Sequence, residues 1–277
     1  MPHPEKPKVL AIVLVGLLYG FFIAIICGQK ITERHYHVFC KARVNQESVN
    51  FECCAMPATF TFSNNCREPI YPGVLTNPGR PAFPTTGFHL DPGARAHYDG
   101  VPATWSGRIL PRRRCSAHAP GSLSCASGDC AGRLKCNGAG NQAPSTLAEF
   151  TLGGSGGNDF YDISNVDGFN VPLQIRPYGA GCAAVTCGAD INAACPPELA
   201  ARAADGTTVG CKSACVAFNT DEFCCRGDHG TPDRCKPNRY SEFFKQRCPQ
   251  AYSYAYDDRS STFTCASGAN YSIVFCP

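Results

Sequence analysis

The chain is poor in the residues that several common kinds of functional site require. Its 277 residues include one tryptophan and seven histidines, and no histidine lies with cysteine in the C-x2-C and H-x3–5-H spacing of zinc sites. No segment interleaves Lys and Arg with aromatic residues, and the net charge is only +3. A Ser-His-Asp catalytic motif is also missing. We therefore expect no metal, no cofactor and no nucleic-acid partner, and we expect a monomer.

Cysteine, in contrast, is abundant. The chain contains 20 cysteines at irregular spacings, including the adjacent pair Cys224 and Cys225. Thiols at this density persist as disulfides only in an oxidising compartment. The chain is also long enough to bury a core of its own. The composition therefore predicts a disulfide-rich protein outside the cytosol.

The N-terminal segment supports this location. An uncharged apolar run extends from Val9 to Cys27 and follows Lys6 and Lys8, which is the order found in a secretory signal. The run is also just long enough to span a bilayer. We favour a signal peptide at residues 1–27 that is cleaved, with a retained signal anchor as the alternative. Residues 28–57 are interpreted as a linker of unknown structure, and the state of four cysteines stays open: Cys27, Cys40, Cys53 and Cys54.

Short β-type runs separated by Gly and Pro begin at Ala58. Residues 58–62 alternate Thr and Phe with the period of a strand, and residues 272–275 close the chain with another strand candidate. Helix signals are confined to the cysteine-rich part. Two prolines before residues 198–203 predict one helix, and Asn238 before residues 239–247 predicts another. A mainly β protein with a sandwich or barrel is the expected fold class.

Several motifs resemble the thaumatin-like protein family, which comprises plant pathogenesis-related family five and the osmotin/thaumatin type. The segment from Gly121 to Cys136 looks like the family signature, with Ser127 where Thr is usual. Further matches follow at residues 159–164 and 167–172, and at the closing Phe-Cys-Pro, so the resemblance covers residues 58–277. It implies a flattened β-sandwich, a disulfide-rich helical domain, a small cysteine-stapled domain, and a cleft between the first two.

The resemblance also implies a pairing for sixteen cysteines, which their spacing alone cannot choose. The eight implied disulfides are Cys66–Cys276, Cys115–Cys125, Cys130–Cys136, Cys182–Cys265, Cys187–Cys248, Cys195–Cys211, Cys215–Cys224 and Cys225–Cys235.

One arginine and four acids line the cleft of the family. By motif position the resemblance places them at Arg108, Glu149, Asp162, Asp167 and Asp190. Clustered carboxylates raise the pKa of at least one member, and an acid that holds its proton beside an ionised carboxylate is what glycoside hydrolysis needs. Glu149 is the candidate proton donor and Asp162 the candidate base or nucleophile. A purely structural alternative is an ion pair with Arg108 and a simple turn at Asp167-Gly168.

The implied function is that of a secreted plant defence or stress protein of the apoplast and cell wall. Its acidic cleft would bind β-1,3-glucan of fungal walls, with weak endo-β-1,3-glucanase and antifungal activity. One alternative is a non-enzymatic inhibitor of microbial glycosidases such as xylanase, with the basic run Arg112-Arg113-Arg114, otherwise a solvated loop, as the inhibitory loop. Another is a protein associated with the wall or membrane, anchored by residues 9–27, that acts without a defined ligand.

Two other residues are candidates for a role outside this cleft. Trp105 has an aromatic ring that could stack on sugar, although a tryptophan among apolar strand neighbours is more often a core residue. Asn270 begins an Asn-Tyr-Ser sequon, which predicts N-glycosylation in a secreted protein.

Overall fold

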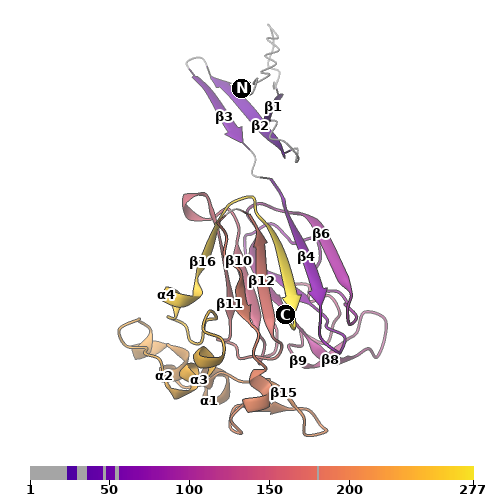
Figure 1. Cartoon of the computed structure of the whole chain (residues 1–277), viewed down its shortest axis with the longest axis vertical. Coiled ribbons are helices and arrows are strands. Elements are labelled where there is room, and N and C mark those ends of the chain that lie inside the picture. The colour runs from indigo at the N-terminus through magenta and orange to yellow at the C-terminus, as the bar shows by residue number, and fades with distance from the viewer. Residues whose placement is uncertain (1–23, 30–35, 46–47, 54–55, 180) are drawn as a thin grey trace, which may run out of the picture. The chain divides into compact units, whose positions relative to one another are not determined.

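A computed structural model describes residues 24–29, 36–45, 48–53, 56–179 and 181–277, with side chains from residue 56 onward (Figure 1). The chain forms two compact units, Met1–Met56 and Pro57–Pro277. In the first unit, β1 (Ala24–Gln29), β2 (Tyr36–Asn45) and β3 (Ser48–Cys53) form an antiparallel sheet in that order. Residues 9–23 of the apolar run lie outside the described residues, so the expectation of a signal peptide or anchor there stays a prediction. No helix in the described ranges is long and apolar enough to cross a membrane.

The second unit contains two five-stranded sheets, which confirms the mainly β fold class. The first sheet has the order β13-β12-β17-β4-β6, with β4 (Ala58–Asn64), β6 (Arg95–Val101), β12 (Leu173–Tyr178), β13 (Val185–Cys187) and β17 (Asn270–Phe275). The second has the order β16-β11-β10-β7-β5, with β5 (Gly73–Thr76), β7 (Ser106–Leu110), β10 (Leu147–Thr151), β11 (Asn158–Ser164) and β16 (Phe263–Ala266).

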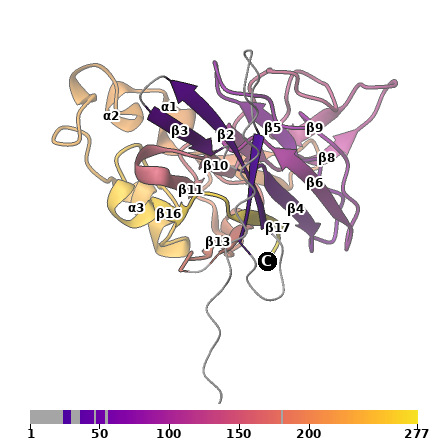
Figure 2. The ribbon, with the colours of Figure 1, turned by 90° about the horizontal axis from the view of Figure 1, so that it is seen from above.

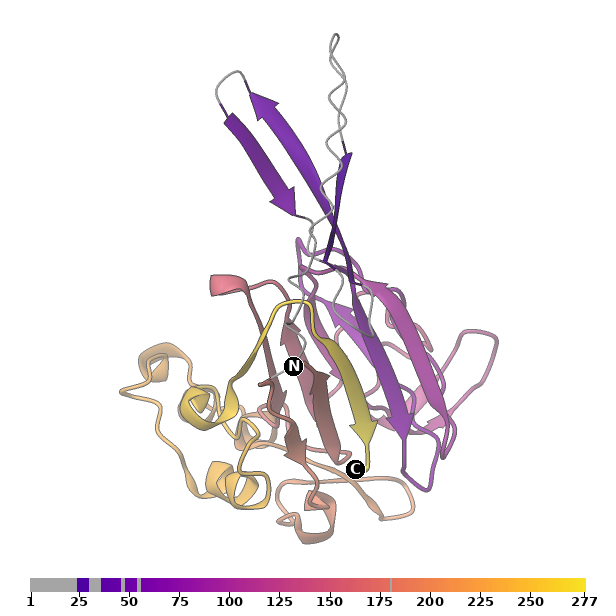
Figure 3. The same ribbon diagram turned by 45° about the horizontal axis from the view of Figure 1, so that its top comes forward.

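The last strand of the unit pairs with its first. β17 runs parallel to β4, with Tyr271 opposite Phe60, and Figure 3 shows the yellow β17 beside the dark purple β4. β4 buries every second residue, as its Thr-Phe alternation predicts.

Aromatic side chains fill the space between the sheets. The ring of Phe60 lies 5.0 Å from that of Phe150, 5.2 Å from Tyr271 and 5.6 Å from Trp105, measured between centroids. Trp105 is fully buried, and its Nε1 donates a hydrogen bond to Thr76 Oγ1 at 3.0 Å. Trp105 is therefore a core residue.

Helices and short hairpins complete the unit. Figure 2 shows α1, α2 and α3 together on one side, away from the hairpin of β8 and β9. The helices are α1 (Ala214–Phe218), α2 (Asp221–Cys224), α3 (Arg239–Arg247) and α4 (Asp258–Ser261), with the 3-10 turns η1 (Ser155–Gly157), η2 (Ile191–Ala194) and η3 (Gly227–His229). The hairpins are β8 (Arg113–Ser116) with β9 (Ser124–Ser127), and β14 (Ala200–Arg202) with β15 (Thr208–Cys211).

One of the two expected helices is present. Asn238 caps α3 by accepting hydrogen bonds from the backbone N–H groups of Tyr240 and Ser241, and Ser241 Oγ completes a capping box. The prediction of a helix at residues 198–203 is wrong, because β14 lies there and pairs with β15. The turn at Gly206, with φ of 80°, favours a hairpin, and the pairing of β14 with β15 satisfies the backbone hydrogen bonds that a helix would otherwise make.

All eight implied disulfides are present. They join Cys66–Cys276, Cys115–Cys125, Cys130–Cys136, Cys182–Cys265, Cys187–Cys248, Cys195–Cys211, Cys215–Cys224 and Cys225–Cys235. The Cys66–Cys276 bond spans 210 residues and links the loop after β4 to the end of β17. It therefore cross-links the chain where its first and last strands of this unit pair.

Candidate active site

Three of the expected site residues form a single row across the second sheet. In the register of the antiparallel strands, Glu149 of β10 is opposite Arg108 of β7 on one side and opposite Asp162 of β11 on the other. Residues directly opposite each other point to the same face of a sheet. Their strand neighbours Phe150 and Tyr161 are buried in the core. The three charged side chains therefore lie on the outer face.

This face carries an acidic groove of about 490 Å³. Asp167, in the turn after β11, also lines it, so the structure brings four of the five expected residues together. The remaining lining residues lie on strands of the same sheet, directly after β5 or β11, or in the segment from Tyr252 to Asp258: Asn77, Gly107, Leu147, Phe150, Thr151, Phe160, Ser164, Val166, Tyr252, Ala255 and Asp258.

Asp190 has a different place. Its carboxylate caps η2 by accepting a hydrogen bond from the backbone N–H of Asn192 at 3.1 Å, and it does not line the acidic groove. Asn270, the sequon residue, is exposed at the start of β17, where its side-chain oxygen accepts a hydrogen bond from the backbone N–H of Thr59 at 2.8 Å. Its glycosylation stays a prediction.

Asp167 is held by a turn that requires glycine at the next position. Gly168 has a φ of 91°, and a Cβ atom there would lie 2.5 Å from the carbonyl oxygen of Cys211. The backbone oxygen of Asp167 also accepts a hydrogen bond from the Ser145 N–H at 3.2 Å. Asp167-Gly168 is thus a turn, as the structural alternative states, and this turn also presents a carboxylate to the groove.

Two groove residues were missed by the sequence analysis. The hydroxyl of Tyr252 donates to Asp258 Oδ1 at 2.7 Å, and the backbone N–H of Tyr252 donates to the carbonyl of Ile163 on β11 at 2.8 Å. This backbone bond fixes the segment beside the acidic row. The adjacent acids at Asp257 and Asp258, directly after a tyrosine-rich stretch, are the signal that could have indicated them.

Burial and charge raise the pKa of both central acids. The pKa of Glu149 rises because the carboxyl is buried; Arg108 partly offsets this, and Asp167 adds to it. Burial first, then the negative charges of Glu149 and Asp258, raise the pKa of Asp162 to about 8. Like charges directly opposite each other in a sheet destabilise it. The pair therefore shares one proton at a pH where isolated carboxylic acids have lost theirs.

The row also holds polar atoms that have no hydrogen-bond partner among the described residues. Arg108 Nε and Asp162 Oδ1 are buried, and neither makes a hydrogen bond with the described residues. Buried polar atoms are nearly always paired, so an unpaired donor and acceptor beside a groove mark a place where ligand hydroxyls can bind. The groove thus combines proton exchange with hydrogen-bonding capacity.

Comparison with known proteins identifies the family. A profile of the Thaumatin family matches residues 64–277. The chain belongs to the thaumatin family. Thaumatin-like protein 1 of Pyrus pyrifolia is 51% identical over 223 residues, which cover 79% of this chain and 91% of that protein. Pathogenesis-related protein 5 of Arabidopsis thaliana is 51% identical over 224 residues, covering 80% and 91% of the two chains.

Another relative and one solved structure complete the comparison. A protein of Prunus avium named glucan endo-1,3-beta-glucosidase is 48% identical over 226 residues, covering 80% of this thaumatin-family chain and 92% of that protein. A laminaripentaose-producing β-1,3-glucanase from Paenibacillus barengoltzii, of glycoside hydrolase family 64, aligns with a TM-score of 0.50 at 11% identity, covering 98% of this chain and 100% of that one. At that identity the likeness concerns the fold alone.

The basic run differs from the solvated loop expected for this thaumatin-family chain. Arg112 is fully buried, and its guanidinium donates to four backbone carbonyls and to Cys130 Sγ. Burial lowers its pKa to about 10. Arg113 pairs with Glu68, and Arg114 pairs with Asp205. Arg112 is therefore a structural residue and not part of a solvated loop, whereas Arg114 is exposed, and an inhibitory role of the run stays a prediction.

Proposed function

We propose that this protein is a secreted plant defence protein whose acidic groove binds β-1,3-glucan and hydrolyses it slowly. The row of Arg108, Glu149 and Asp162 carries the proposal, because it places a shared proton beside unpaired hydrogen-bonding atoms. The names of the relatives from Prunus avium and Arabidopsis thaliana support the glucan substrate and the defence role. Eight disulfides favour an oxidising, extracellular location, with residues 1–27 as the signal and residues 58–277 as the functional domain.

Binding follows from the polar lining of the groove. Arg108 and Asp162 are both half-buried at the groove, and a rotation of each side chain on binding lets Arg108 Nε donate to a sugar hydroxyl and Asp162 Oδ1 accept from one. Phe160 and Tyr252 supply ring surface at the same groove. A glucan, with hydroxyls around its edge and C–H groups on its faces, suits such a mixture of polar and aromatic groups.

Hydrolysis needs one protonated and one ionised carboxyl group. Arg108 lies beside Glu149 and favours its ionised form, while Glu149 and Asp258 surround Asp162 with negative charge and favour its protonated form. These surroundings favour the reverse of the roles expected from the sequence. Asp162 then protonates the glycosidic oxygen as its bond to the anomeric carbon breaks. Glu149 either deprotonates the water that attacks this carbon, or attacks the carbon itself to form a covalent intermediate that water then hydrolyses.

The test separates binding from turnover. We expect the purified protein to co-sediment with insoluble β-1,3-glucan and to release reducing sugar from it, whereas Glu149→Gln and Asp162→Asn retain binding within a few fold and lose release. The matched control is Glu242→Gln, on the exposed surface of α3. Release that persists in both groove variants would refute the hydrolytic role, and absence of binding by the wild type would refute the function.

A further inference from the structure

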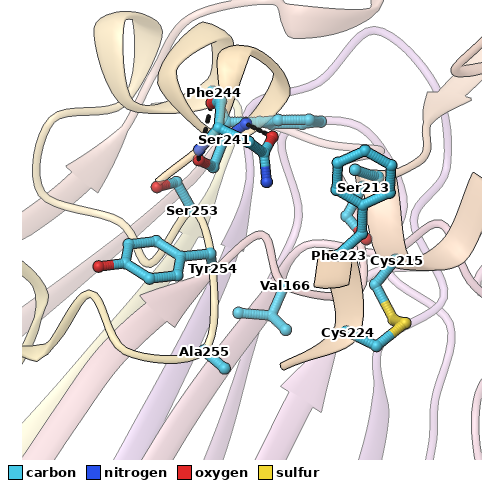
Figure 4. A pocket seen from close by; sticks show the side chains of 12 residues that line it. Val166, Ser213, Cys215, Phe223, Cys224, Ser241, Phe244, Ser253, Tyr254 and Ala255 are labelled. Atoms are coloured by element: carbon cyan, nitrogen blue, oxygen red, sulfur yellow. Dashed lines mark hydrogen bonds between the residues drawn. A yellow bond between two sulfur atoms is a disulfide. The ribbon is translucent and has the colours of Figure 1, made fainter. Parts of the chain in front are cut away.

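A second hollow lies beside the acidic groove, next to the helices. It is a small hollow of about 40 Å³ between α3, the loop at Tyr254, and the Cys215–Cys224 disulfide. Val166 and Ala255 line both this small hollow and the acidic groove. In Figure 4, Tyr254 borders it on one side and Phe223 on the other, with Val166 between them. The two hollows are therefore neighbours that share a wall.

The small hollow in turn adjoins a surface cluster of aromatic side chains. Phe223 lines both the small hollow and an open depression that it forms with Phe218, Arg239 and Tyr240. We call this depression the aromatic platform. The ring of Phe218 lies 5.4 Å from that of Phe223 and 5.2 Å from that of Tyr240, measured between centroids. Shared residues thus connect the acidic groove to the aromatic platform in two steps.

The exposure of Phe218 is unusual. Among residues 56–179 and 181–277, the exposed large apolar side chains are Tyr178 and Phe218, with 58% and 37% of their surface accessible. The other rings of the platform are more deeply placed, and Tyr240 is buried. Phe218 therefore offers a ring to a ligand while Phe223 and Tyr240 support it from below.

Charged groups contact the Tyr240 ring, which supports Phe218 in the aromatic platform. The guanidinium of Arg239 lies 4.6 Å from the centroid of the Tyr240 ring and donates to its hydroxyl at 2.6 Å. That hydroxyl donates to Glu198 Oε1 at 3.4 Å. A depression that combines an exposed aromatic ring with a guanidinium matches a neutral sugar, whose C–H face packs on the ring while its hydroxyls accept hydrogen bonds from the guanidinium. So few apolar residues make a poor site for a membrane or a hydrophobic peptide.

We propose that the aromatic platform is a distal subsite for the same β-1,3-glucan chain, with one glucosyl unit stacked on Phe218. This proposal rests on the proposed function of the acidic groove. A polysaccharide that enters the groove continues past Val166 and Ala255 and reaches Phe218 only when the chain is long enough. The platform therefore confers a preference for long chains over short oligosaccharides.

Chain length gives the decisive experiment. Affinity is measured by isothermal titration with laminaritriose and with a soluble, long linear β-1,3-glucan. Stacking one sugar ring on Phe218 buries enough apolar surface for about a tenfold gain in affinity. We expect Phe218→Ala to weaken binding of the long glucan about tenfold and to leave laminaritriose binding unchanged. Phe218→Trp, which keeps a ring, should restore the preference.

The matched control is Tyr178→Ala, at the other exposed ring, which should bind both ligands like the wild type. A melting temperature recorded for each variant separates lost folding from lost stacking. If Phe218→Ala binds the long glucan as tightly as the wild type does, or if it changes only self-association in sedimentation, the distal subsite is refuted while the proposed function stands. If the wild type binds neither glucan, both proposals fail.

Discussion

Replacing Asp162 by Asn should stabilise the protein, and increasingly so as the pH rises. The carboxyl group has a pKa near 3.8 when unperturbed and about 8 in the folded protein, because burial and the charges of Glu149 and Asp258 disfavour its ionised form. A group whose pKa is raised by folding stabilises the folded state below its unfolded pKa and loses that contribution as the pH rises through the folded pKa. The wild type should therefore lose stability between about pH 4 and pH 8.

The size of the effect follows from the shift. About four pKa units correspond to about 5–6 kcal/mol. Because the proton is shared with Glu149 and the site relaxes, we expect about half of this, ~3 kcal/mol, as the gain of Asp162→Asn at pH 8. Asp162 Oδ1 accepts no hydrogen bond from the part of the chain that the structure describes, so the substitution breaks none of those bonds at that atom. For a domain of this size, the melting temperature should rise by about 6–12 °C.

Calorimetry of the wild type and of Asp162→Asn at pH 4 and pH 8, with disulfides intact, tests this predicted gain in stability. The difference in melting temperature should be small at pH 4 and large at pH 8, whereas Glu242→Gln should show no such pH dependence. Equal melting temperatures of wild type and Asp162→Asn at pH 8 would refute the argument that the groove holds a buried, repelling pair.

Three further predictions concern the framework around the groove. Replacing both Cys66 and Cys276 by Ala opens a cross-link spanning 210 residues and should lower the free energy of unfolding by about 5 kcal/mol, read from denaturant midpoints. Arg112→Lys retains the charge but not the planar set of donors, so calorimetry should show a loss of about 2–4 kcal/mol with glucan binding unchanged. Gly168→Ala forces a Cβ atom against the Cys211 carbonyl, so it should lower the free energy of unfolding by about 2 kcal/mol or more and weaken glucan binding through the displaced turn. An unchanged melting temperature together with unchanged binding would contradict the role of this turn.

Much of the site could be predicted because its residues lie in short motifs. The family resemblance placed four groove residues by motif position, Arg108, Glu149, Asp162 and Asp167, and the register of the strands brings the first three together on one face. Asp190 was expected in the groove on motif position, but nothing in a linear pattern distinguishes a groove carboxylate from one that caps a short helix.

Other features depend on contacts that a sequence does not display. Three consecutive arginines suggest a solvated loop, but the partners of Arg112 are mostly backbone carbonyls, which every residue carries. Asp258 reaches the groove from nearly a hundred residues beyond β11, through the backbone pairing of Tyr252 with Ile163. The helix wrongly expected before β15 shows the same limit, since cross-strand pairing overrode local propensity.

The acidic row depends on the register of three neighbouring strands. Its three residues come from three strands, and a slip of one residue in register would turn a side chain to the opposite face. Repulsion between Glu149 and Asp162 favours such a slip. Cys265 of β16 is opposite Asp159, three residues before Asp162 on β11, and its bond to Cys182 limits the movement of β16 along β11. The cross-link therefore acts at the β16–β11 edge of the sheet, whereas the β10–β11 register that pairs the acids is set by the ladder between these two strands and by the burial of Phe150 and Tyr161 on their other face.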